Sequence, residues 1–147
     1  MTLGGAGGYG LSANLGGLIA FGAVTFGAVT TAHLYAYAGG QIICVGSYGI
    51  SGGAAEHFFF FSGSTFGHFG GPFVCTLTGT PAFSAAFAAA SDNGVLQAQS
   101  SWLTFSGAAT GPRYLASTNA TINTFGSGAS YFPGSSAGSV SNNGVYI

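Results

Sequence analysis

Few side chains in this sequence could perform acid–base or nucleophilic chemistry. The 147 residues include two carboxylates, Glu56 and Asp92, one arginine, Arg113, and no lysine. Cleavage of a glycosidic bond requires two carboxylates that flank one bond, and these two are 36 residues apart in sequence. Asp92-Asn93-Gly94 is typical of a turn, so we expect Asp92 to support a turn and Glu56 to be solvated or paired beside His57. We therefore predict no catalytic residues and no enzyme.

Three histidines, His33, His57 and His68, are the remaining candidates for a metal site. Imidazole is the commonest metal-binding side chain, but the sequence contains no H-x-H or H-x-x-x-H pair. We expect His33 and His57, which begin equivalent strands of the repeat described below, to stack or hydrogen-bond without a metal. Gly5 to Gly10 matches G-x-G-x-x-G but opens no apolar helix, as a dinucleotide site requires. No metal and no cofactor is predicted.

The two cysteines, Cys44 and Cys75, fall at different offsets in their repeats. We expect them not to face each other in adjacent coils and to be buried as small apolar side chains. A disulfide between subunits is the alternative, in an oxidising environment, and the sequence leaves that choice open. The sequence has no C-x-x-C motif to indicate zinc binding or redox catalysis.

Charged residues make up only 2% of the chain, against about a quarter in an ordinary domain. The chain is also 15% aromatic, whereas disordered chains have few aromatic and many charged residues. A net charge of −1 with one arginine offers nothing to neutralise phosphates, so nucleic acid is excluded as a partner. A surface without an ionic coat suggests a structural subunit that other copies of the chain cover.

The N-terminal residues show neither a basic start nor an apolar run followed by a cleavage site. We therefore expect the chain to fold where it is made, in the cytoplasm. The uncharged stretch 15–45 contains six glycines and His33 and alternates like a strand, which argues against a membrane-spanning helix. No membrane insertion is predicted.

Alternation with a period of two dominates the sequence and predicts an all-β fold. Segments such as Leu34-Tyr-Ala-Tyr-Ala and Trp102-Leu-Thr-Phe-Ser are rich in aromatic and β-branched residues and are separated by Gly, Ser, Asn and Pro. The alanine-rich segment 82–90 is short and uncapped for a helix, and we expect a strand there.

A repeat is visible when the segments that end in glycine are aligned. GISG, TLTG, TFSG and YFPG end at intervals of 27, 28 and 27 residues, at Gly52, Gly79, Gly107 and Gly134. A second strand recurs near Ile42, Phe66, Leu96 and Ile122, and a third begins at His33, His57, Ala85 and Arg113. Three short strands per unit of this length predict one coil of a parallel β-helix. We expect the four glycines to occupy turns or close backbone contacts.

The predicted fold is a short right-handed parallel β-helix of about four coils of ~27 residues. A jelly roll or another β-sandwich is the alternative, because it also has short strands at regular spacing. Residues 13–134 form the predicted solenoid domain. Residues 1–12 are assigned to a flexible or capping arm, and residues 135–147 to a cap or a partner-contact tail, because the terminal coils of a solenoid need covering.

Phenylalanines are more concentrated around residue 60 than the interior of a narrow coil stack could accommodate. Neighbouring side chains of a strand point to opposite faces, so two of the four phenylalanines at 58–61 must point outward. Exposed apolar patches mark interfaces, and closed symmetry is the usual way to bury them. The candidate interface residues are Phe58, Phe59, Phe60, Phe61, Phe66, Phe69 and Phe73.

The segment from Thr76 to the end carries the strings GTPAFS, TFSGAATGPRY and ASYFPG, followed by SAG near the terminus. It resembles the C-terminal regions of tail-fibre or tailspike-like virion proteins of phages and prophages, and the similarity covers about half of the chain. The resemblance implies a β-helical and trimeric virion component.

We therefore expect a structural protein of a bacteriophage virion, a fibre-like or spike-like subunit that forms a homotrimer. Its expected partners are copies of itself, other virion proteins and a glycan of the host surface. A decoration protein of the capsid or collar is one alternative. A polysaccharide depolymerase on the same scaffold is the other, and the scarcity of carboxylates argues against it.

Overall fold

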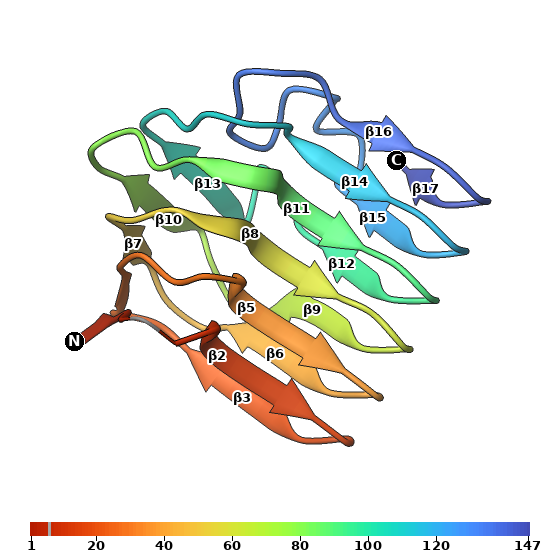
Figure 1. Cartoon of the computed structure of the whole chain (residues 1–147), viewed down its shortest axis with the longest axis horizontal. Coiled ribbons are helices and arrows are strands. Elements are labelled where there is room, and N and C mark those ends of the chain that lie inside the picture. The colour runs from red at the N-terminus through yellow and green to blue at the C-terminus, as the bar shows by residue number, and fades with distance from the viewer. Residues whose placement is uncertain (6) are drawn as a thin grey trace.

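The computed structural model describes residues 1–5 and 7–147 and consists of stacked parallel β-strands (Figure 1). The chain winds through three parallel sheets in turn, so that each strand pairs with the strands one coil before and one coil after it. This confirms the predicted all-β solenoid and excludes the β-sandwich. The termini lie at opposite ends of the stack (Figure 1).

The three sheets, named A, B and C here, hold five, six and six strands. Sheet A contains β1 (Thr2–Leu3), β4 (Thr25–Phe26), β7 (Tyr48–Ile50), β10 (Phe73–Leu77) and β13 (Leu103–Ser106). Sheet B contains β2 (Tyr9–Asn14), β5 (Ala32–Tyr37), β8 (Ala54–Phe60), β11 (Phe83–Ala90), β14 (Tyr114–Ala116) and β16 (Ser139–Val140). Sheet C contains β3 (Leu18–Phe21), β6 (Gln41–Cys44), β9 (Thr65–His68), β12 (Val95–Gln97), β15 (Thr121–Asn123) and β17 (Val145–Tyr146).

The stack has about six coils, where the sequence predicted about four. The additional strands lie at the two ends: β1 to β4 precede the first predicted unit, and β16 and β17 follow the last one. Strands therefore occur in both terminal segments, 1–12 and 135–147, and Ala6 of the first segment lies outside the described residues. The described part of the chain contains no helix that could span a membrane.

The predicted register is correct along sheet C, but in sheets A and B it is correct only for the first interval, where Ile50 pairs with Leu77 and Ala32 with Glu56. Ile42, Phe66, Leu96 and Ile122 do pair in succession along sheet C. In sheet A, however, Cys75 pairs with Phe105, so the true interval there is 30 residues, two more than predicted. In sheet B the partner of His57 is Phe87 and not Ala85, because the pairing of β8 with β11 shifts between Phe83 and Ala86. The segment YFPG, which ends at Gly134, forms a bend and no strand.

The alanine-rich segment is strand β11, as predicted, and its pairing partners explain why. Each residue of β11 from Ala88 to Ala90 lies between a residue of β8 and one of β14. The aromatic side chains of β8 fill the interior of their coil. The alanines of β11, in the next coil, therefore have little interior space left to fill. The segment is buried from Ala86 to Ala90.

Sheets B and C are joined by tight turns that stack into a regular column. Two successive residues in each turn have positive φ, as at Ala38 and Gly39 (51° and 76°) or Asp92 and Asn93 (47° and 62°). The amide of the second residue donates a hydrogen bond to the next coil, from Gly39 to Ser62 and from Gly63 to Asp92, each at 3.1 Å. Asp92 therefore lies in a turn, as the sequence indicated, but the turn links two sheets of the solenoid.

The core is a column of aromatic and aliphatic side chains enclosed by the three sheets. The largest buried residues are Phe26, Phe58, Phe60, Phe66, Phe83, Phe87 and Phe132. Their rings meet edge to face or tilted, as for Phe58 and Phe66 with centroids 4.7 Å apart, the geometry that aromatic pairs favour. Burial of this apolar area is the main source of the stability of the fold.

Candidate interaction surface

Sheet B presents a cluster of aromatic side chains on its outer face. In β5, Leu34 and Ala36 are buried while Tyr35 and Tyr37 are partly exposed. In the next coil Phe58 and Phe60 are buried, and Phe59 and Phe61 are partly exposed. Tyr9 of β2 completes the cluster and is 43% exposed. We call Tyr9, Tyr35, Tyr37, Phe59 and Phe61 the aromatic face.

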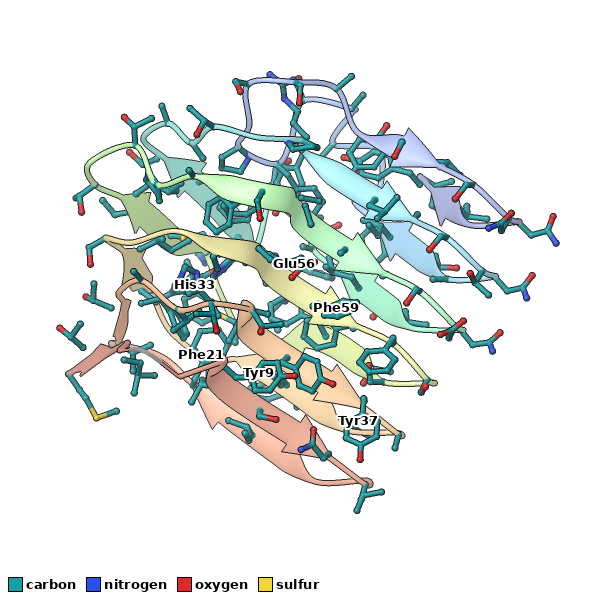
Figure 2. All side chains as sticks on the ribbon, viewed as in Figure 1. Tyr9, Phe21, His33, Tyr37, Glu56 and Phe59 are labelled. Atoms are coloured by element: carbon teal, nitrogen blue, oxygen red, sulfur yellow. The ribbon has the colours of Figure 1, made fainter. Side chains whose placement is uncertain are left out.

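The aromatic face is continuous because the parallel register places its residues one above another. Tyr35 pairs with Phe59 across β5 and β8, and its ring centroid lies 5.7 Å from that of Phe59. The Tyr9 ring lies 4.0 Å from Tyr35, and Tyr37 stacks on Phe61 at 5.6 Å. Figure 2 shows Tyr9, Tyr37 and Phe59 on the same side of the molecule.

The aromatic face ends one coil further on and carries little charge. The residue of β11 that pairs with Phe59 is Ala89, which is only 3% exposed. Burial and the neighbouring Tyr9 raise the pKa of Tyr35 to about 12, so that its phenol stays neutral at physiological pH. The surface is therefore apolar, with hydroxyl groups only on its tyrosines.

The structure places the seven predicted interface phenylalanines in four environments. Phe58, Phe60 and Phe66 are fully buried in the core and cannot reach a partner. Phe59 and Phe61 belong to the aromatic face, and Phe73 packs partly buried against the core. Phe69 lies elsewhere, in the loop after β9, and is 80% exposed.

Glu56 lies in β8 at the margin of the aromatic face (Figure 2). Its neighbours in the adjacent coils are Ala32 and Ala86, both fully buried, so no polar side chain flanks it along the sheet. Its Oε2 atom is buried without a hydrogen-bond partner among the described residues. Burial raises the pKa of Glu56 to about 7. The predicted pairing with His57 does not occur, because the His57 ring points into the core.

The two carboxylates are placed too far apart to act as a catalytic pair. Glu56 pairs with Ala86 in the next coil, and Asp92 follows six residues later in the turn after β11. Six residues of extended strand span about 20 Å, whereas paired carboxylates in glycosidases lie about 5 to 9.5 Å apart. Arg113 donates a hydrogen bond to the backbone carbonyl of Ser136, at 3.2 Å.

His33 and His57 form a hydrogen-bonded chain inside the core, and the predicted hydrogen bond between their rings is present. The Nε2–H of His33 donates to the carbonyl of Gly27 at 2.9 Å. The Nδ1 of neutral His33 then accepts from the Nδ1–H of His57 at 3.1 Å. The remaining Nε2 of His57 accepts from the hydroxyl of Tyr48 at 2.9 Å. Each ring nitrogen is satisfied when both imidazoles are neutral.

The environment of these histidines favours the neutral form. Burial lowers the pKa of His33 to about 4 despite its bond to Gly27. Burial and then the proximity of His33 place the pKa of His57 well below its ordinary value. Within residues 1–5 and 7–147, no three His, Cys, Asp or Glu side chains gather in an arrangement that could hold a metal ion.

Both cysteines are buried as free thiols. Cys44 lies in sheet C and Cys75 in sheet A, so they do not face each other along one sheet. The thiol of Cys44 donates to the carbonyl of Gly46 at 3.2 Å. Burial raises the pKa of both thiols, which keeps them protonated and unreactive.

The four glycines of the predicted repeat have different structural roles. Gly79 and Gly107 have positive φ, at 72° and 104°, a conformation that L-residues adopt at a cost. At Gly107 a Cβ would also collide with the carbonyl oxygen of Leu77. Gly52 and Gly134 lie where the backbone passes close to another part of the chain. A Cβ at Gly52 would meet the backbone of Ala28, and one at Gly134 would meet the backbone of Gly111.

No protein-family model, curated protein or solved structure matches this chain significantly.

The three tyrosines of the aromatic face were not among the predicted interface residues. Their signal is present in the strand that begins at His33: alternation sends Tyr35 and Tyr37 to the face opposite Leu34. Aligning this strand with the strand that begins at His57 places Tyr35 beside Phe59 and Tyr37 beside Phe61. The two columns of rings would then have been predicted together.

Proposed function

We propose that this chain is a structural subunit of a bacteriophage virion, of fibre or spike type, which assembles as a homotrimer. The observation that carries this proposal is the aromatic face, a continuous apolar patch on an outer sheet of a molecule with almost no charge. Such patches mark interfaces, and identical patches on identical chains are buried most simply around a symmetry axis. The resemblance of the segment after Thr76 to tail-fibre and tailspike regions supports the virion assignment and the trimer.

Assembly is tested by measuring the mass of the purified chain by light scattering at micromolar concentration. We expect about three times the monomer mass of 14.4 kDa. The double variant Tyr35→Ser, Phe59→Ser should shift this mass toward that of the monomer while the chain stays folded. The control is Leu18→Ser, because Leu18 is an exposed apolar residue (62%) on the outer face of sheet C. A monomeric parent chain, or an unchanged mass in the double variant, would contradict assembly through this face.

The virion assignment has a separate test. Mass spectrometry of purified particles from a culture that carries the gene should detect this chain at a copy number that is a multiple of three. Particles without the chain would refute the virion role even if the purified protein is a trimer.

A further inference from the structure

A second aromatic cluster lies away from the aromatic face, on the loops that connect sheet C to sheet A. These loops surround an open hollow of about 440 Å³. The residues that line it are His68, Phe69, Gly70, Gly71, Pro72, Ser101 and Trp102. We call this hollow the corner pocket. Its volume lies in the range of sites for small ligands.

The corner pocket exists because two coils are enlarged at this point. We compared the number of residues between a fixed position in sheet C and a fixed position in sheet A of the same coil. This number is six in the first coil, seven in the second and ten in each of the next two. The corresponding residue pairs are Ile19 to Thr25, Ile42 to Gly49, Phe66 to Thr76 and Leu96 to Ser106. Insertions in a solenoid map to loops on one face, which is often the binding face.

Aromatic rings form the walls of the corner pocket and stay in contact with solvent. The rings of His68 and Trp102 lie 4.1 Å apart, and Phe125 of the next coil, outside the lining of the pocket, lies 5.8 Å from Trp102. Phe69 is 80% exposed, Phe125 50% and Trp102 39%. A stable fold does not require such exposure, because other large apolar side chains of these coils are buried in the core. The exposed rings are therefore available to a ligand.

Polar groups that can make new hydrogen bonds accompany these rings. Among the described residues, the Ser101 hydroxyl, the Trp102 indole N–H and the His68 imidazole have no hydrogen-bond partner. Partial burial lowers the pKa of His68, so its ring is neutral at neutral pH and can donate from one nitrogen and accept at the other. No formally charged side chain lines the pocket. The site therefore combines aromatic faces with neutral donors and acceptors.

We propose that the corner pocket binds a neutral sugar ring of a surface glycan. One face of a pyranose presents C–H groups that pack on the negative face of an aromatic ring, while its hydroxyls bond to groups such as Ser101 and His68. A carboxylated or sulfated sugar would find no cation here. A protein partner fits less well, because stable protein interfaces bury about 800 Å² per partner over a broader surface. This inference rests on the proposed function, because a fibre or spike subunit of a virion is placed to contact the host surface.

Trp102 is the only tryptophan of the chain, so tryptophan fluorescence reports directly on the corner pocket. The probes are the methyl glycosides of glucose, galactose, mannose, N-acetylglucosamine and N-acetylgalactosamine, with methyl glucuronide and sialic acid as charged comparisons. We expect at least one neutral glycoside to shift the emission to shorter wavelength and to saturate in the millimolar range. The charged sugars should leave the spectrum unchanged.

Variants then distinguish binding in the pocket from a general effect on the protein. Phe69→Ser should weaken the affinity for the neutral sugar at least fivefold, and it should not affect folding because Phe69 is exposed. Val74→Ser is the control, since Val74 is exposed on the neighbouring strand β10 outside the pocket. Saturation transfer NMR should still detect the sugar with Trp102→Phe, which keeps an aromatic ring at that position.

The possible outcomes separate this inference from the proposed assembly. The double variant Tyr35→Ser, Phe59→Ser should keep the fluorescence response even where it has lost the trimer, because the two surfaces are distinct. No response to any of the five neutral glycosides, or an equal response in Phe69→Ser and the parent, would overturn the sugar site. A response to the charged sugars alone would overturn it too. A trimer without sugar binding would refute this inference and leave the proposed assembly intact.

Discussion

Glu56 is a carboxyl group placed where its charge is unfavourable. Its Oε2 is buried without a partner in the described structure, and its pKa is raised to about 7. The folded chain therefore retains a proton on Glu56 at a pH at which the unfolded chain has lost it. This raised pKa contributes stability that is fully present below the ordinary pKa of 4.5 and is lost as the pH rises through about 7.

The substitution Glu56→Gln tests this placement. Glutamine has the same shape and no charge, so the variant should be more stable than the parent by about 1 kcal/mol at about pH 8. This value is smaller than the full pKa difference implies, because the residue is only half-buried. At about pH 4 the two proteins should have similar stability. Urea unfolding at both pH values provides the measurement, and an equal difference at both would contradict the raised pKa.

The buried histidines give the opposite dependence on pH. Their pKa values are lowered in the folded state, so the stability they contribute is present above about 6.5 and falls as the pH drops toward 4. Glu56 opposes this fall between pH 4.5 and 7. In Glu56→Gln, acid should therefore destabilise the fold more steeply than in the parent.

At the scale of residues, the sequence predicted which residues lie side by side in adjacent coils better than it predicted which way their side chains point. The pairing of His33 with His57 followed from their equivalent positions in the repeat. The orientation of Glu56 did not, because His57 and Phe58 are consecutive and both point inward. This departure from alternation places Glu56 outside the core, and no pattern of residue types marks where it occurs.

The turns between sheets B and C show why elements were only partly predictable. Asp92-Asn93 uses residues that tolerate positive φ, and the sequence indicated a turn there. The equivalent turns place Leu15, Ala38 and Thr118 at φ near 50°, which such residues rarely adopt. Hydrogen bonds between stacked turns hold these residues in place. Because these hydrogen bonds come from the neighbouring coil, rules that consider only nearby residues in sequence cannot predict the turns.

Two glycines that end strands of sheet A should differ in their tolerance of substitution. Gly79→Val should destabilise by about 1 to 2 kcal/mol, because valine is strained at positive φ but has open space there. Gly107→Val should cost about 3 kcal/mol or more, because the Leu77 carbonyl also blocks its side chain. Denaturant unfolding of both variants measures the difference.

Gly67→Val is the matched control for these two substitutions. Gly67 lies in β9, its φ is not positive, and its side-chain direction is open. Valine favours strands, so this variant should be as stable as the parent or slightly more stable. Equal losses at all three positions would show that the added side chain, and not the local backbone, determines the cost.

At the scale of the whole molecule, the sequence predicted the solenoid but not its length or its site-bearing loops. The paired positions of successive coils are separated by 23 residues between Tyr9 and Ala32 but by 30 between Thr65 and Val95. A search for one even interval averages these values to about 27 and loses the end coils. The enlarged coils are those that form the corner pocket, so the irregularity that obscured the repeat is also the feature that creates the candidate site.

The forces that hold the molecule together can be distinguished by salt. Three charged side chains in 147 residues leave almost no electrostatic attraction for salt to screen, and an exposed ion pair contributes at most about 1 kcal/mol. We expect the melting temperature of the assembly to change by less than about 3 °C between about 0.02 M and about 1 M sodium chloride. Sodium sulfate should raise it and urea should lower it, because both act on the burial of apolar surface. A large fall in sodium chloride would contradict cohesion by apolar burial and backbone hydrogen bonds, and would indicate that a charged partner holds the assembly together.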